Sequence, residues 1–183
     1  MPTSTLRQPF VLWFTGLPAA GKTTISTLIA DQLERAGVVA EHLDGDVVRT
    51  HLSRGLGFSK EDRDINVERV AWVASRLARA GAPVLVSMVS PYAESRQRAR
   101  NLVEEHAAFI EVHVATPLEQ CVDRDPKGMY ARAYAGELSD FTGVSAPYEE
   151  PIEPELRLET TDRDVGDCVA EVWSALKTRG LLN

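Results

Sequence analysis

The 183-residue chain carries 27 acidic and 20 basic residues, giving a net charge of −7, and 44% of it is hydrophobic. This length and composition are typical of one soluble domain with a real core, and they exclude two ordinary domains. The acidic balance argues against sequence-independent nucleic-acid binding, which requires a basic face. An anionic substrate would therefore have to be met by a local cluster of cations.

Residues 1–9 are polar and contain two prolines, so we expect a flexible N-terminus followed by a single domain over residues 10–183. Cys121 and Cys168 both fall in helical patterns, and we expect each to be buried rather than paired. With neither a signal peptide nor a disulfide framework, the expected location is the cytoplasm. The apolar run at 10–14 is much too short to span a bilayer, so no membrane contact is expected.

Strand and helix patterns alternate along the chain. The expected strands are residues 10–14, 38–43, 83–89, 109–114 and 156–159. The expected helices are residues 24–35, 47–52, 61–80 and 93–105, one opened by Thr116 as N-cap, and 165–179. Gly37 and Gly180 are natural helix stops, and Ser59 with Asp62 has capping-box spacing. The alternation predicts a parallel sheet of about five strands between two layers of helices, an α/β/α arrangement.

Behind the first strand, Gly16–Thr23 has the spacing G-x-x-x-x-G-K-T of a phosphate-binding loop, and a helix follows it. Glycine lets the backbone turn its N–H groups toward phosphate oxygens, and the helix N-terminus adds donors. The lysine would reach the β- and γ-phosphates, and the threonine hydroxyl would hold Mg²⁺. A chance Gly/Ala-rich turn is the alternative. The expected ATP contacts in this region are Gly16, Leu17, Pro18, Ala19, Ala20, Gly21, Lys22, Thr23 and Thr24.

Asp44 and Asp46 follow the second strand, where the carboxyl ends of parallel strands collect ligands. A phosphoryl transferase needs one carboxylate near the metal and another to orient or deprotonate the attacking hydroxyl. The alternative is an Asp-Gly turn in which Asp46 caps the helix 47–52. Arg49 lies on that helix, which opens at the same region.

Two further strand-end features leave alternatives open. Phe58, in a glycine-rich turn, would stack on an adenine or merely anchor its loop. Ser90, at the end of the third strand, would donate to a phosphate, act as a nucleophile or end the strand. No base is adjacent to it in the sequence, and none of the four histidines is placed to serve, so a binding or structural role is favoured.

Residues 125–155 break the rhythm and are rich in Gly, Pro, Tyr and charge. A segment this long without clear structure is usually a functional lid, which we place at about residues 124–150. Its cations, among them Arg124 and Lys127, would neutralise charge on a transferring phosphoryl group, and its closure would exclude water. A solvated surface loop is the alternative.

These motifs occur together and in order. They are Gly16–Thr23, Asp44-Gly45-Asp46 with Arg49, Leu56-Gly57-Phe58-Ser59 through Arg63 and Asn66, Ser90-Pro91-Tyr92, Arg124-Asp125-Pro126-Lys127-Gly128, and Phe141-Thr142-Gly143 with Pro147-Tyr148. From about Val11 to Leu158 the chain resembles the adenylylsulfate (APS) kinases. These enzymes phosphorylate the ribose 3′-hydroxyl of APS to give PAPS in sulfate activation. The resemblance implies a P-loop kinase fold with a lid over the site.

The resemblance also implies roles for individual residues. ATP would lie on the phosphate loop and beside Arg124, with Mg²⁺ at Thr23 and Asp44. Lys22, Asp44, Asp46 and Lys127 would be catalytic, and Ser90 would be a phosphoserine intermediate only if transfer were not direct. A homodimer is implied as well. The implied APS contacts are Asp46, Arg49, Phe58, Arg63, Asn66, Val89, Ser90, Lys127 and Phe141, with the rings of Phe58 and Phe141 on either side of the adenine.

The chain departs from the family pattern at a few positions. Leu-Pro-Ala-Ala stands between the loop glycines where serine and glycine are more usual, and Pro18 removes one N–H from the cradle. Thr23 keeps the hydroxyl of the commoner serine, and Val47 replaces a usual asparagine. The alternative functions are a related P-loop kinase acting on another small-molecule hydroxyl and a non-catalytic nucleotide-binding module. The phosphate loop alone does not distinguish an APS kinase from either of these two classes of protein.

Overall fold

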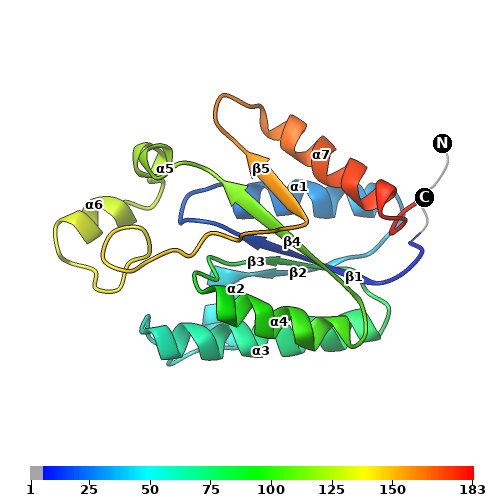
Figure 1. Ribbon diagram of the computed structural model, residues 1–183, viewed down its shortest axis with the longest axis horizontal. Coiled ribbons are helices and arrows are strands. Elements are labelled where there is room, and N and C mark those ends of the chain that lie inside the picture. Colours follow the sequence, from blue (N-terminus) through cyan, green and yellow to red (C-terminus); the bar gives the residue numbers. More distant parts are fainter. Residues whose placement is uncertain (1–5) are drawn as a thin grey trace.

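The five strands form one parallel sheet in the order β2-β3-β1-β4-β5 in the computed structural model, which describes residues 6–183. The strands are β1 (Phe10–Thr15), β2 (Glu41–Asp44), β3 (Val84–Ser87), β4 (Ala108–Ala115) and β5 (Leu156–Glu159). The helices are α1 (Lys22–Arg35), α2 (Gly45–His51), α3 (Lys60–Arg79), α4 (Ala93–Glu104), α5 (Leu118–Arg124), α6 (Met129–Tyr134) and α7 (Val165–Thr178). Figure 1 shows α3 and α4 on one face of the sheet and α1 and α7 on the other. The predicted three-layer α/β/α fold is confirmed.

The central strand β1 is buried on both faces. Phe10, Leu12 and Phe14 belong to the core under α1 and α7, while Val11 and Trp13 belong to the core under α3 and α4. Successive side chains of a strand point to opposite faces, so a continuous apolar run serves both cores. The apolar run in the sequence therefore marks the centre of the sheet.

The second strand begins later than its apolar pattern predicts. Gly37 takes φ +80°, and the Val38 amide donates to the Leu33 carbonyl at 2.9 Å. This bond closes α1 in the manner of a Schellman motif, with glycine in the left-handed position. Val38 is thus used to end the helix, and pairing of β2 starts only at Glu41.

The predicted cap at Ser59 is present, but the one at Thr116 is wrong. Ser59 Oγ accepts from the Asp62 amide at 3.1 Å, and the Asp62 carboxylate accepts from the Gly57 amide at 3.0 Å. Thr116 Oγ1 instead donates to the carbonyl of Ala20 at 2.7 Å, and α5 starts after Pro117. A hydroxyl that suits an N-cap here holds the phosphate loop.

The expected irregular segment contains one short helix, α6, which begins after Gly128 in the left-handed conformation. We call residues 124–150 the lid segment; in Figure 1 it extends beyond the carboxyl ends of the strands. At the other end of the molecule Leu6 forms a bridge with Leu182, while residues 1–5 of the expected flexible N-terminus lie outside the described residues. Cys121 and Cys168 are buried and free, as expected. Within residues 6–183, each helix is too short or too polar to cross a membrane.

Candidate active site

The phosphate loop, Gly16–Thr23, joins β1 to α1 at the carboxyl edge of the sheet. Gly16 has φ +149°, and a Cβ there would lie 2.6 Å from the carbonyl oxygen of Val114 on β4. Gly21, the N-cap of α1, has φ +103°. Only glycine tolerates both the close approach and the left-handed backbone, which explains the spacing of the two glycines. Ala19 adopts φ +60° without that freedom.

Lys22 folds back across the loop that precedes it. Its Nζ donates to the carbonyl of Gly16 at 2.9 Å and to that of Leu17 at 2.7 Å, and the residue is 8% exposed. Burial lowers the pKa of Lys22 to about 8, opposed by nearby acidic groups. The ammonium group therefore sits in the cradle where phosphate oxygens would bind, with desolvation that an anion would offset.

Thr23 and Asp44 meet between α1 and β2. Thr23 Oγ1 donates to Asp44 Oδ2 at 2.7 Å, and Asp44 Oδ1 accepts from the Asp46 amide at 3.0 Å. Asp44 is thus the N-cap of α2, and the alternative in which Asp46 caps this helix is wrong. A hydroxyl and a carboxylate side by side are the hard oxygen donors that Mg²⁺ prefers. Among residues 6–183 no cluster of three His, Cys, Asp or Glu side chains is suited to a metal, so phosphate and water would complete its shell.

Asp46 and Lys127 form an ion pair that joins the end of β2 to the lid segment. Both side chains are well exposed, and the hydrogen bond to Asp46 raises the pKa of Lys127. Arg124, at the end of α5, donates to the carbonyl of Ala20 at 3.4 Å. Cations of the lid segment therefore contact both the loop and the carboxylate, although the sequence separates them by about a hundred residues.

Arg49 and Arg63 surround the turn that carries Phe58. Arg49 donates to the Gly57 carbonyl at 3.0 Å, and its guanidinium lies 4.3 Å from the centre of the Phe58 ring. Arg63 donates to the carbonyls of Phe58 at 2.8 Å and Asp140 at 2.5 Å. Burial lowers the pKa of both arginines. Arg63 therefore sets the distance between the Phe58 turn and the Phe141 segment of the lid.

The two expected stacking rings differ in their surroundings. Phe58 is 49% exposed, whereas Phe141 is 6% exposed and packs edge-to-face on Tyr130 with 5.1 Å between ring centres. Both rings line the same cavity. Phe141 is therefore a fixed wall, whereas Phe58 is half exposed and has the Arg49 guanidinium over its ring.

Ser90 is held rather than free. It is 2% exposed with φ +44°, its Oγ accepts from Trp13 Nε1 at 3.0 Å, and its carbonyl accepts from Arg96 at 2.7 Å. The neighbouring Val89 carbonyl accepts from Thr15 Oγ1 at 2.7 Å. This turn also explains why β3 ends at Ser87, earlier than predicted. The hydroxyl has no histidine partner among the hydrogen bonds of the described chain; His42, for example, bonds Ser26 and Ser87.

One cavity of about 600 Å³ unites these groups. The expected site residues that line it are Pro18, Ala19, Gly21, Lys22, Thr23, Thr24, Asp44, Asp46, Arg49, Phe58, Arg63, Asn66, Val89, Ser90, Arg124, Lys127 and Phe141. Gly16, Leu17 and Ala20 shape the loop from behind and are not part of the lining. The strand ends singled out in the sequence therefore meet at a single cavity.

Thr142 and Tyr130 also line the cavity, although neither of them was assigned an individual role from the sequence. Thr142 is 1% exposed, and its Oγ1 has no hydrogen-bond partner within residues 6–183. Tyr130 donates from its hydroxyl to the carbonyl of Pro18 at 3.1 Å and so supports the loop from α6. Asn66, which was predicted, has an equally unpartnered Oδ1 in the same part of the chain and is 3% exposed. The Phe-Thr-Gly motif marked the region of Thr142, but no pattern in the sequence indicates that the hydroxyl is buried and unpaired.

Comparisons with known proteins agree on one family. The family model described as Adenylylsulphate kinase matches residues 8–159. An adenylyl-sulfate kinase of a Synechococcus strain is 48% identical over 174 residues, which is 95% of this chain and 98% of the relative. A probable adenylyl-sulfate kinase of Pseudomonas aeruginosa is 50% identical over 89% of this chain and 75% of its own.

Solved structures give the same result. The APS kinase of Mycobacterium tuberculosis in complex with AMPPNP and APS has a TM-score of 0.90 and 43% identity, covering 93% of this chain and 98% of its own. A hexameric APS kinase from Thiobacillus denitrificans has a TM-score of 0.76 and 34% identity, and the match covers 97% of this chain but 30% of that one. A sugar kinase from Janibacter, at 18% identity and a TM-score of 0.64, shares the fold alone.

Proposed function

The chain belongs to the adenylylsulfate kinase family, and we infer that it transfers the γ-phosphoryl group of ATP to the ribose 3′-hydroxyl of APS, releasing PAPS and ADP. The observation that carries this inference is the single cavity that joins the phosphate loop to the Phe58 turn and the lid segment. A kinase needs donor and acceptor in one water-excluding space, with the two reacting oxygens in line.

We propose that ATP occupies the half of the cavity formed by the phosphate loop and Arg124. Loop amides and Lys22 would bind the phosphates, and the existing contact of Lys22 with two loop carbonyls keeps its ammonium group in the cradle. Thr23 and Asp44 would hold Mg²⁺, which supplies neutralisation of charge on the β- and γ-phosphates. The pairing of their oxygens at 2.7 Å supports this assignment.

APS would occupy the other half. Its adenine would lie between Phe58 and Phe141, with Arg49 and Arg63 supplying charge for the phosphosulfate or holding the two walls apart. Asn66 supports a nucleotide acceptor because its buried Oδ1 lacks a partner within residues 6–183. An adenine edge offers an amino donor to such an oxygen, and a buried polar atom left unpaired is costly.

We assign proton transfer and stabilisation of the developing charge to Asp46 and Lys127. Asp46 would accept the proton of the 3′-hydroxyl, and Lys127 would stabilise the charge on the transferred group. Their mutual ion pair supports closure of the lid segment over the acceptor, which would keep water from taking the phosphoryl group. Direct in-line transfer suffices, and the bonded, buried hydroxyl of Ser90 supports a positioning role rather than a phosphoserine intermediate.

The decisive assay measures PAPS formed from ATP and APS, with adenosine and gluconate as control acceptors. We expect PAPS and ADP in equal amounts with APS and no phosphorylated product with the controls. Asp46→Asn should remove the activity while ADP binding stays unchanged. Phosphorylation of a control acceptor in preference to APS would favour another P-loop kinase, and no turnover with any acceptor would favour a binding module.

We also propose a homodimer in the cytoplasm, on the strength of the family alone. The assembly is checked by light scattering of the purified chain, for which a mass near twice 20.1 kDa is expected. A monomer, or a hexamer like the Thiobacillus denitrificans protein, would contradict it.

A further inference from the structure

Arg96, in the first turn of α4, is a buried cation outside the cavity lining. It is 4% exposed, and its three donor nitrogens bond three different segments. Nη1 donates to the Ser90 carbonyl, Nε to Glu111 Oε1 and Nη2 to the Glu149 carbonyl, each at 2.7 Å. The planar guanidinium fork suits such multiple, oriented bonds, whereas an ammonium group acts as a single point.

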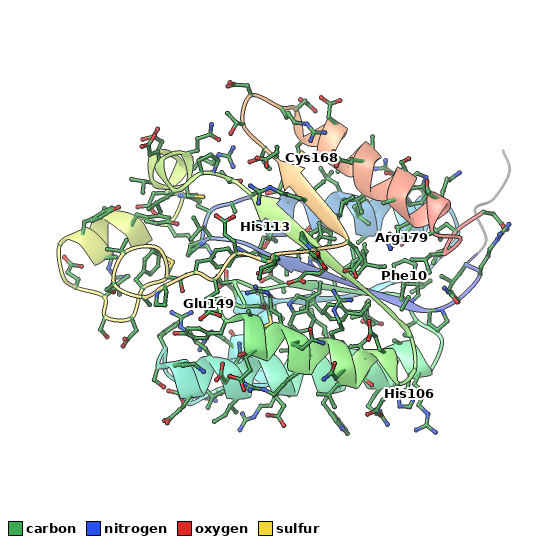
Figure 2. All side chains as sticks on the ribbon, viewed as in Figure 1. Phe10, His106, His113, Glu149, Cys168 and Arg179 are labelled. Carbon is green, nitrogen blue, oxygen red and sulfur yellow. The ribbon has the colours of Figure 1, made fainter. Side chains whose placement is uncertain are left out.

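One of the three segments is the far end of the lid segment, which is fastened at the same place by other bonds. The Glu149 amide donates to the Pro91 carbonyl at 2.8 Å, and its carboxylate accepts from the Ala93 amide at 2.7 Å. Figure 2 shows Glu149 beside the start of α4. Tyr148, the preceding residue, shares a hydrogen bond of 3.0 Å with Thr15 Oγ1 on β1. The lid therefore returns to the body of the protein at the end of β3.

The second segment carries a strained residue of the cavity wall. Ser90 has φ +44°, a backbone conformation that L-residues other than Asn and Asp rarely adopt. Such strain persists only where surrounding contacts over-determine it. Trp13 holds the Ser90 side chain and Arg96 holds its carbonyl, so removal of Arg96 leaves the backbone of this wall with fewer restraints.

We infer that Arg96 is a positioning residue for the acceptor. It holds the Val89–Ser90 wall and the end of the lid segment at a fixed distance from each other, with Glu111 of β4 as the counter-charge. The inference rests on the proposed function, because the wall at Val89 and Ser90 is assigned to APS there. Arg96 touches no reacting group, so its loss acts on APS binding and on the frequency of productive closure.

Arg100, one turn further along α4, is a matched control. Its guanidinium makes two bonds of 2.8 Å to Glu155 and lies 3.6 Å from Glu111, with its side chain 17% exposed. These partners lie outside the cavity lining. A change at Arg100 therefore removes a comparable partly buried ion pair from the same helix without releasing Ser90 or Glu149.

The experiment compares Arg96→Met, Arg96→Lys and Arg100→Met in steady-state kinetics and thermal unfolding. We expect Arg96→Met to raise KM for APS at least tenfold and to lower kcat, with KM for ATP within twofold of wild type. Arg96→Lys keeps a charge for Glu111 but cannot bridge three segments, so its KM for APS should rise by an intermediate factor. Arg100→Met should lower Tm but leave KM for APS within twofold.

An unchanged KM for APS in both Arg96 variants would overturn the inference, as would an equal rise in Arg100→Met. If Arg96→Met does not fold, Arg96→Lys decides by the same criterion. If the wild-type chain makes no PAPS, the proposed function fails, and hydrogen exchange then tests the positioning role of Arg96 separately. Amides of residues 89–92 and 145–150 should then exchange faster in Arg96→Lys than in Arg100→Met, and equal rates would overturn the positioning role.

Discussion

Burial acts against the charge of Lys22, the one lysine of the phosphate loop. In the unfolded chain this lysine would titrate near the ordinary lysine pKa of 10.5, whereas burial in the native state lowers its pKa to about 8. Between pH 8 and 10.5 the unfolded state therefore binds more protons, and native stability rises with pH across that window. Below pH 8 the whole cost of holding the buried cation is present.

Lys22→Met should consequently remove activity and yet stabilise the ligand-free protein. We expect the free energy of unfolding to rise by about 1–3 kcal/mol at pH 7, the lower values allowing for the two loop carbonyls that lose their donor. Urea unfolding at pH 7, 8.5 and 10 measures this, and the gain should shrink as the pH rises. If the variant were less stable than wild type at pH 7 and the difference did not depend on pH, the lowered pKa of Lys22 would be contradicted.

At the scale of elements, the Phe58 turn is built for exposure of a ring. Asp62 and Arg49 bond the backbone at Gly57, so the ring is held at the cavity mouth although half of it faces solvent. Phe58→Ala should weaken APS binding by about 1–3 kcal/mol, the usual worth of a base–aromatic stack, and leave ATP binding unchanged. Calorimetric titration with each nucleotide checks this. Ile65→Ala on α3, 41% exposed and outside the cavity lining, is the control.

The lid contact between Lys127 and Asp46 contributes little to folding. Exposed ion pairs are worth about 0–1 kcal/mol, and these side chains are 61% and 74% exposed. Lys127→Met should therefore leave Tm nearly unchanged but lower kcat/KM at least about a hundredfold, if its charge stabilises the transition state as we propose. Lys60→Met removes the ion pair of an exposed lysine with Asp64, away from the cavity, and should keep full activity. Equal activity of the two variants would exclude a catalytic role for Lys127.

The elements also show which parts of the fold could be predicted from the sequence. Alternating strand and helix patterns predicted the parallel sheet, because buried strands and capped helices depend on local composition. The patterns placed β2 three residues too early, since Val38 is apolar in order to close α1 rather than to pair. Thr116 looked like an N-cap, but its tertiary partner, the Ala20 carbonyl, lies 96 positions away in the chain. Local propensity cannot register a partner at that distance.

In the candidate site too, some features follow from local sequence motifs and others depend on contacts between residues far apart in the chain. Glycine spacing and strand-end carboxylates located the cavity, because the fold brings the carboxyl ends of parallel strands together. The assignment of Arg63 to APS did not include its bonds to Phe58 and Asp140, which only the folded chain creates. Arg96 lies in a helix that also carries Arg98 and Arg100, and nothing in the local sequence distinguishes it from them. Burial separates these residues from their neighbours, and burial is a property of the tertiary structure.

At the scale of the whole molecule, the net charge of −7 is reversed locally. The cavity lining holds five cations and three carboxylates, namely Lys22, Arg49, Arg63, Arg124 and Lys127 against Asp44, Asp46 and Asp125. The elements that supply these charges come from the whole length of the chain up to the lid. A nucleotide bound across the cavity would therefore contact α1, α2, α3 and the lid segment together, and we expect it to stabilise the fold as a unit.

Binding of AMPPNP with Mg²⁺ should raise Tm, because a ligand that binds only the folded state stabilises that state. A ligand at a hundred times its Kd adds about 2.7 kcal/mol of stability, which for a domain of this size is about 5–10 °C. EDTA should remove most of the shift, because Thr23 and Asp44 would then face the phosphates without a cation between them. In Asp44→Asn, AMPPNP with Mg²⁺ should raise Tm only by the small amount expected for wild type in EDTA, whether or not EDTA is added. A shift that EDTA leaves unchanged in the wild-type chain would show that Thr23 and Asp44 do not act through a metal.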